Sequence, residues 1–264
     1  MNSQAPIGVF DSGVGGLSIL SGIHELMPGE TLQYVADSAH APYGPKGADF
    51  IRARCEAIMQ FMLRLEVKAV VVACNTATAA AIAQMRDRYD LPIIGVEPAI
   101  KPAAEQSRSG VVGVLATSGT LTSEKFMDLQ NRFVSRARIL TRACNGLVEL
   151  IEQVAPNPFT LERMLHEFVQ PLVDAGADTL VLGCTHYSLI RPQIQKAAGP
   201  EVRIVDAGTA VAKELQRRLT MHGLCNTSAR GGIVHFHTSG KLEQQNRLLA
   251  HYWGKPVQAG LLGV

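Results

Sequence analysis

Two short segments of the chain repeat one pattern of residues, centred on Cys74 and Cys184, which stand 110 residues apart. Each segment, 70–76 and 180–186, is a run of β-forming residues that ends in a small residue, a cysteine and polar residues able to begin a helix. Such runs are typical of buried strands in a parallel sheet, with the cysteine where the strand gives way to a loop.

Other segments repeat at nearly the same spacing. Residues 7–12 resemble 112–117 at a distance of 105, and 94–97 resemble 203–206 at a distance of 109. Three pairs in the same order indicate two copies of one α/β unit. Two related halves that each bring a thiol to a strand end can hold one small molecule between them. That arrangement suits a reaction that takes a proton from one face of a carbon and returns one to the other.

Strand and helix patterns alternate along almost the whole chain, which predicts an α/β fold with parallel sheets and helices on both faces. We expect two pseudo-symmetric, doubly wound parallel-sheet domains with the active site between them. The first domain is expected to comprise 1–97 and 208–264, and the second 98–207. Expected strands are 7–10, 32–36, 69–73, 93–96, 111–115, 138–141, 179–182, 203–205 and 233–236, and expected helices include 51–65, 76–89, 123–133, 161–175 and 207–221.

The overall composition excludes several classes of protein. The 264 residues are 47% hydrophobic and 18% charged, which is ordinary for a soluble globular protein. A net charge of +2 without a basic stripe does not suggest nucleic acid as a primary ligand. No apolar segment approaches a membrane span, and the N-terminus does not resemble a signal peptide. Five cysteines without close spacing do not form a disulfide framework, so we expect a cytoplasmic protein with reduced thiols.

The first expected strand leads into Asp11 and the glycine-rich segment 12–16. Clustered glycines before a helix let backbone N–H groups approach an anion. The segment lacks the spacing of a dinucleotide site, and no phosphate-loop motif occurs in the chain. We therefore expect this loop to favour a carboxylate ligand over a phosphate. The alternative is that Asp11 merely caps the following helix.

Polar residues follow the other strand ends as well, where doubly wound folds bind their ligands. Tyr43 and Gly44 lie in the rigid loop 41–47, which is either part of this cleft or an ordinary turn. His186 next to Cys184 can lower the pKa of that thiol or relay protons. Further candidates beside the strand ends are Asn75, Thr76, Thr117 and Thr185.

Cysteine and histidine have other uses. A metal site would need close CxxC or HxxxH spacing, which is absent, so we expect no metal. A hydrolase that uses Cys184 with a histidine leaves Cys74 and the repeat without a role. A single cysteine at a strand end is also often a small buried hydrophobe. Three cysteines are interpreted as structural or incidental: Cys55, Cys144 and Cys225.

Five motifs together resemble the glutamate racemases, cofactor-independent members of the aspartate/glutamate racemase superfamily. They are GVFDSGVGGLS near the N-terminus, PYGPKG, ACNTATA around Cys74, VLATSGT, and GCTHYSLI around Cys184. The resemblance spans nearly the full length, and it implies two α/β domains with substrate between them. The chain departs from the family at Ser188, where proline is common, and at 143–146, where the family often has ACPG. Neither departure touches an acid/base position.

The resemblance also implies residue roles. Cys74 and Cys184 correspond to the two acid/base thiols, Asp11 to the group that assists the first, and His186 to the group that assists the second. Glu152 corresponds to a further acidic residue on the side of the second cysteine. The positions that bind substrate in the family correspond to Asp11, Ser12, Tyr43, Gly44, Asn75, Thr76, Thr117, Thr185 and His186.

The implied activity is racemisation of L-glutamate to D-glutamate without a cofactor, supplying peptidoglycan synthesis. Cys184 would deprotonate L-glutamate and Cys74 D-glutamate. A thiol with a pKa of about 8.5 must be tuned down by its neighbours to act as a base near neutrality. The expected partner is L- or D-glutamate, and neither nucleic acid nor a membrane is expected. A homodimer is one oligomeric state that the chain could adopt. Two alternatives stay open: a relative acting on aspartate or a hydantoin, and a non-catalytic amino-acid-binding module.

Overall fold

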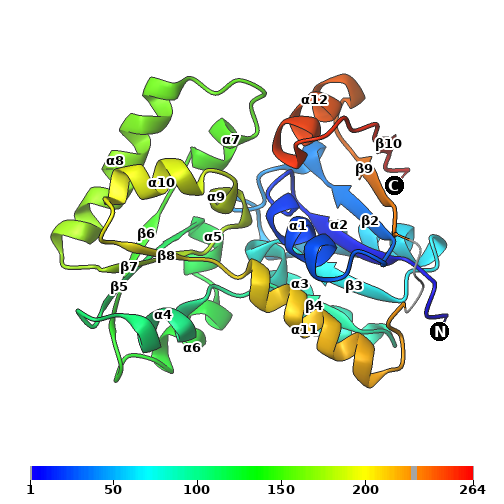
Figure 1. Ribbon diagram of the computed structural model, residues 1–264, viewed down its shortest axis with the longest axis horizontal. Helices are drawn as coiled ribbons and strands as arrows, with labels where there is room; N and C mark the ends of the chain where they lie inside the picture. Colours follow the sequence, from blue (N-terminus) through cyan, green and yellow to red (C-terminus); the bar gives the residue numbers. More distant parts are fainter. Residues whose placement is uncertain (1, 227–230, 264) are drawn as a thin grey trace.

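Two parallel sheets, each covered by helices, form two lobes that lie side by side (Figure 1). The computed structural model describes residues 2–226 and 231–263. Sheet A is ordered β10-β9-β2-β1-β3-β4, and sheet B is ordered β6-β5-β7-β8. The strands are β1 (Ile7–Asp11), β2 (Leu32–Ala36), β3 (Ala69–Val72), β4 (Ile93–Gly95), β5 (Val111–Ala116), β6 (Arg138–Ala143), β7 (Thr179–Leu182), β8 (Arg203–Val205), β9 (Val234–Thr238) and β10 (Gly260–Leu261).

The first four strands of each lobe follow the same spatial order. In sheet A this order is β2-β1-β3-β4, and in sheet B it is β6-β5-β7-β8. Each central strand pairs in parallel with its neighbours on both sides. The repeat predicted from the sequence is thus present in the topology. Cys74 follows β3 and Cys184 follows β7, which occupy equivalent places in the two sheets.

Helices pack on both faces of each sheet, as the alternating pattern predicts. One face of sheet A packs against α1, α11 and α12, and the other packs against α2 and α3. Sheet B packs against α7 to α10 on one face and against α4 and α6 on the other. The helices are α1 (Leu17–Leu26), η1 (Ser38–His40), α2 (Ala48–Arg64), α3 (Asn75–Arg88), α4 (Ile100–Gln106), α5 (Ser118–Leu121), α6 (Glu124–Asn131), α7 (Leu147–Ile151), α8 (Pro158–Asp174), α9 (Thr185–Leu189), α10 (Arg191–Ala198), α11 (Gly208–Met221) and α12 (Leu242–Trp253).

Several element boundaries differ from the expected ones for local reasons. Helix α8 begins at Pro158 rather than at 161, because the Asn157 side chain accepts the N–H groups of Phe159 and Thr160 and caps the helix. Strand β10 was not expected. It has only two residues and lies at the edge of sheet A beside β9, where no hydrophobic alternation marks it.

The chain enters sheet B after β4 and returns to sheet A after β8. Sheet A takes its strands from 7–95 and 234–261, whereas sheet B takes them from 111–205. This distribution supports the division we propose, with one domain of 1–97 and 208–264 and the other of 98–207. In the described part of the chain, no helix combines the length and the apolar character needed to cross a membrane.

Candidate active site

The carboxyl ends of the central strands of the two sheets face each other across a narrow cavity. Both sheets contribute, because Asp11 ends β1, Cys74 follows β3 and Cys184 follows β7. Nearly every candidate from the sequence is present there. The lining residues are Ser12, Pro42, Tyr43, Gly44, Cys74, Asn75, Thr76, Thr117, Val148, Cys184, Thr185 and His186.

Cys74 lies in a buried and negatively charged environment. Its sulfur caps α3 by accepting the N–H of Ala77 at 3.4 Å, and it lies 3.8 Å from the hydroxyl of Ser12. Burial and the nearby carboxyl of Asp11 raise the pKa of the Cys74 thiol well above its usual value. One of the two thiols must stay protonated so that it can donate to the carbanion, and the acid beside Cys74 fits that sulfur for this state. Cys74 rests as a thiol.

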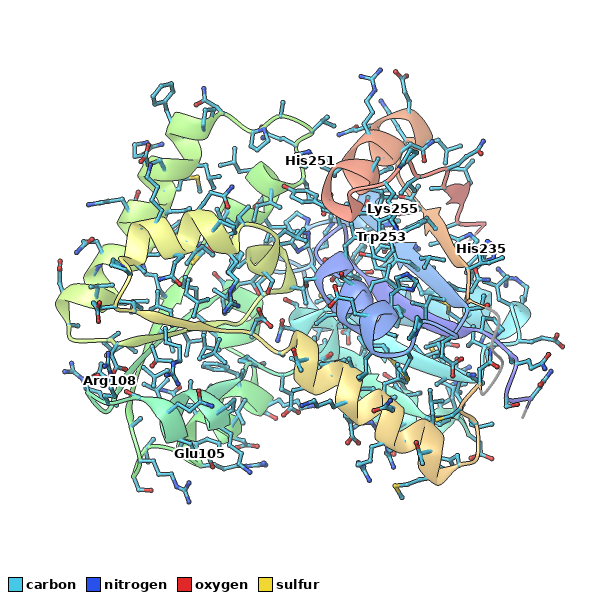
Figure 2. All side chains as sticks on the ribbon, viewed as in Figure 1. Glu105, Arg108, His235, His251, Trp253 and Lys255 are labelled. Carbon is cyan, nitrogen blue, oxygen red and sulfur yellow. The ribbon has the colours of Figure 1, made fainter. Side chains whose placement is uncertain are left out.

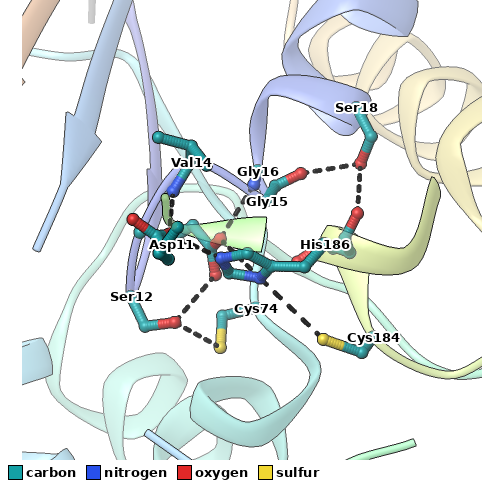
Figure 3. A network of polar contacts seen from close by, with 12 residues as sticks. Asp11, Ser12, Val14, Gly15, Gly16, Ser18, Cys74, Cys184 and His186 are labelled. Carbon is teal, nitrogen blue, oxygen red and sulfur yellow. Dashed lines mark hydrogen bonds and ion pairs between the residues drawn. The ribbon is translucent and has the colours of Figure 1, made fainter. Parts of the chain in front are cut away.

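Cys184 has the opposite kind of neighbour. Its sulfur lies 3.9 Å from Nδ1 of His186, and Nε2 of that imidazole contacts Oε1 of Glu152 at 2.7 Å (Figure 3). Burial by itself lowers the pKa of His186. Its contacts with Cys184 and Glu152 and the charge of Asp11 outweigh burial and hold that pKa well above the usual value. His186 is therefore a cation at neutral pH, placed where it stabilises negative charge on the Cys184 sulfur.

Glu152 supports the imidazole from outside the cavity. It is the residue that follows α7, and it lines a second, wider groove of about 540 Å³ rather than the cavity between the thiols. The same Oε1 that contacts His186 also accepts the backbone N–H of Val14 at 2.7 Å. Glu152 thus connects the second-cysteine side of the site to the glycine-rich loop that follows β1.

The glycine-rich loop does bind carboxylates, but they belong to the protein. The N–H of Val14 is taken by Glu152, and the N–H of Gly16 donates to Oδ2 of Asp11 at 2.8 Å. These two donors are therefore occupied by side chains of the protein and are not offered to a ligand carboxylate. Asp11 is fully buried, which raises its pKa despite the nearby charge of His186. Asp11 therefore accepts the N–H of Gly16 at the start of α1 and also lies 3.8 Å from the imidazole of His186.

The glycines of this loop are required by the close approach of the second lobe. A Cβ atom on Gly13 would lie 1.8 Å from Oε1 of Glu152, and one on Gly15 would lie 2.2 Å from Nδ1 of His186. Neither glycine has a positive φ, so the requirement is space rather than backbone conformation. The sequence GVGG at 13–16 therefore permits the contact between the two lobes at the site.

Neutral donors line the rest of the cavity. The hydroxyls of Thr76 and Thr117 lie 3.0 Å apart, and each also contacts the hydroxyl of Thr120, so the two lobes meet through this cluster. Asn75 is buried, and its Nδ2 has no hydrogen-bond partner. A buried amide without an acceptor is costly, which marks Nδ2 as a donor that awaits a ligand. No lysine or arginine is among the residues that line this cavity.

The hydrogen bonds that hold Tyr43 in place through Asp37 were not predicted from the sequence. The hydroxyl of Tyr43 donates to Asp37 at 2.6 Å, and the guanidinium of Arg54 donates to both oxygens of the same carboxylate at 2.9 and 3.0 Å. Asp37 is fully buried, and although burial raises its pKa, these hydrogen bonds lower it below the usual value. Asp37 directly follows β2, so the strand-end rule that selected Asp11 also points to it.

Known proteins resemble this chain in sequence and in fold. The Asp/Glu/hydantoin racemase family matches residues 7–215. A glutamate racemase of Ectopseudomonas mendocina is 50% identical over 257 residues, covering 97% of each chain. A solved glutamate racemase of Bacillus anthracis superposes with a TM-score of 0.88 at 29% identity, covering 98% of each chain. A Francisella tularensis glutamate racemase solved in complex with D-glutamate gives a TM-score of 0.83 at 28% identity, covering 98% of this chain and 97% of that one.

The family model and the similar relatives place this two-lobed α/β chain among the racemases, which are isomerases. The chain belongs to the Asp/Glu/hydantoin racemase family.

Proposed function

We propose that this isomerase interconverts L- and D-glutamate without a cofactor, by a mechanism in which two thiols act on opposite faces of the α-carbon. The observation that carries the proposal is the pairing of Cys74 and Cys184 on one cavity, one beside an acid and the other beside a cation. The relatives named glutamate racemase support glutamate as substrate, as does the related structure that holds D-glutamate.

The charges predispose the two sulfurs to different roles. The imidazolium of His186 favours a thiolate at Cys184. This thiolate acts as the base that removes the α-proton of L-glutamate. The Cys74 thiol then gives its proton to the other face of the carbanion, which leaves a thiol at Cys184 and a thiolate at Cys74. In this scheme Asp11 assists Cys74, and Glu152 acts through His186. D-Glutamate reacts by the reverse steps.

Neutral donors stabilise the charge that develops on the α-carboxylate during proton removal. Preorganised hydrogen-bond donors in a site that excludes water are effective in this role. The free Nδ2 of Asn75 and the hydroxyls of Thr76, Thr117 and Thr185 are the groups we assign to substrate oxygens. Ser12, Tyr43 and Gly44 line the same cavity and complete the proposed binding set.

We assign the product to peptidoglycan synthesis, which requires D-glutamate, and the place of action to the cytoplasm, where thiols stay reduced. The two catalytic sulfurs must be free for the mechanism to operate, and all five cysteines are free in the structure.

The test follows the α-hydrogen in deuterated water. Purified protein with L-glutamate and no added cofactor should yield D-glutamate that carries α-deuterium, while L-glutamate recovered at low conversion stays largely unlabelled. Added pyridoxal phosphate should change nothing. Product without α-deuterium would contradict the two-thiol scheme, and faster turnover of aspartate or a hydantoin would assign the chain to another substrate of its family. Binding of glutamate without turnover would favour a non-catalytic amino-acid-binding module.

A further inference from the structure

Tyr252 makes a contact between the lobes that the site described above does not include. It lies in α12, which packs on sheet A, and its neighbours His251 and Trp253 are labelled in Figure 2. Its hydroxyl donates to the backbone carbonyl of Ile151 at 3.1 Å. Its ring packs against the hydrophobic clusters of both lobes. The side chain therefore joins the last helix of one lobe to α7 of the other.

The carbonyl that Tyr252 contacts belongs to the last residue of a short helix. Helix α7 has five residues, and the last carbonyls of a helix lack partners within it. A helix of this length has little stability of its own, so outside contacts decide where its end lies. The next residue is Glu152, which contacts His186 at 2.7 Å. A donor that fixes the Ile151 carbonyl therefore also fixes the start of the Glu152 side chain.

We propose that Tyr252 is a positioning residue for the reaction: its hydroxyl fixes the end of α7 and thereby the Glu152 carboxylate that orients His186 beside Cys184. The inference rests on the proposed function. Burial, with a smaller contribution from the charge of Glu152, raises the pKa of Tyr252 to about 12. The hydroxyl therefore keeps its proton and remains a donor over the pH range of an assay.

Tyr252→Phe tests the hydroxyl while keeping the ring that packs between the lobes. We expect kcat to fall about fivefold in the L-to-D direction, the size of one net hydrogen bond, with KM within about twofold. The equilibrium constant between the enantiomers is fixed, so kcat/KM falls equally in both directions. The side of the defect is shown by isotope effects on kcat/KM. Compared with the unmodified protein, Tyr252→Phe should show a larger deuterium isotope effect with α-deuterated L-glutamate, whose deuteron goes to Cys184. With α-deuterated D-glutamate, the isotope effect should be smaller.

A double-mutant cycle tests whether Tyr252 acts through Glu152. In the Glu152→Gln background, adding Tyr252→Phe should have no further effect on kcat, because the carboxylate to be positioned is absent. Tyr89→Phe is the matched control. It removes a hydroxyl that contacts Glu56, away from the lobe boundary, and should leave kcat and both isotope effects unchanged.

Melting curves give the folded fraction at the assay temperature, so that loss of activity through unfolding is counted separately. A lower melting temperature with unchanged kcat and isotope effects would show that Tyr252 is structural only, and would overturn the proposal. Additive losses in the cycle would also overturn it, since Tyr252 would then act independently of Glu152. Absence of glutamate racemisation by the unmodified protein would instead contradict the proposed function.

Discussion

At the scale of single residues, the two thiols differ in the sign of the charge beside them. Asp11 lies close to Cys74, whereas His186 lies 3.9 Å from the sulfur of Cys184. An acid disfavours a thiolate and a cation favours one. The Cys74 sulfur therefore rests as a thiol that can donate a proton, whereas the Cys184 sulfur faces a cation.

This difference predicts selective alkylation. Iodoacetamide at pH 7.5 should modify Cys184 at least about tenfold faster than Cys74, because the thiolate is the reactive form. Peptide mass spectrometry at short reaction times measures the ratio. Both thiols are similarly buried, at 5% and 7% exposure, so access does not explain a preference. His186→Asn should remove it, and faster labelling of Cys74 in the unmodified protein would contradict our assignment of charges.

At the scale of elements, the loop between β1 and α1 admits the second lobe only because Gly13 and Gly15 have no side chain. Gly15→Ala would place a Cβ 2.2 Å from Nδ1 of His186. We expect kcat/KM to fall at least about 100-fold, because moving a catalytic group by about 1 Å can reduce the rate by that factor. The matched control is Gly22→Ala inside α1, where the nearest atom is 3.7 Å away.

The control should retain activity and gain stability of about 0.5–1 kcal/mol, because alanine suits a helix interior better than glycine. Kinetics and thermal melts of both variants measure these outcomes. An active Gly15→Ala protein would mean that His186 can move aside without loss, and would contradict its fixed position beside Cys184.

Most of these elements could be predicted because hydrophobic runs and strand-end residues are local features. The strands 32–36, 179–182 and 203–205 were predicted with their observed limits. The hydrogen bonds that hold the site residues in place could not be predicted in this way. Contacts such as that of Glu152 with the N–H of Val14, 138 residues away, depend on how the two lobes meet. The Val14 amide looked available for a ligand for the same reason, whereas the partner of the Gly16 amide, Asp11, lies near in sequence and was considered as a cap.

At the scale of the whole molecule, the contact between His186 and Asp11 places opposite charges on the two sides of the boundary between the lobes. Asp11 belongs to the sheet A lobe, whereas His186 and Glu152 belong to the sheet B lobe, and the imidazole lies between the two acids. The protonated imidazole therefore stabilises the joined lobes as well as the thiolate.

The sign of the pH dependence follows from the raised pKa of His186. A group whose pKa is higher in the folded state stabilises the protein fully below its unfolded pKa, about 6.5 for histidine. That contribution is lost as the pH rises through the folded pKa. The melting temperature of the unmodified protein should exceed that of His186→Asn most near pH 6, and the gap should narrow toward pH 9. A gap that widens with pH would contradict a charged imidazole at the boundary.

The order of the strands along the chain has a consequence for synthesis. Strand β9 pairs with β2, yet it is made after every strand of sheet B, so β2 keeps a free edge for most of translation. Free edges invite pairing with other chains, and N-terminal regions fold first on the ribosome. Helix α12, which carries the tyrosine that contacts α7, follows β9. We therefore expect a nascent chain to contain both sulfurs well before it can align them, so that chemistry begins only after β9 and α12 have been made.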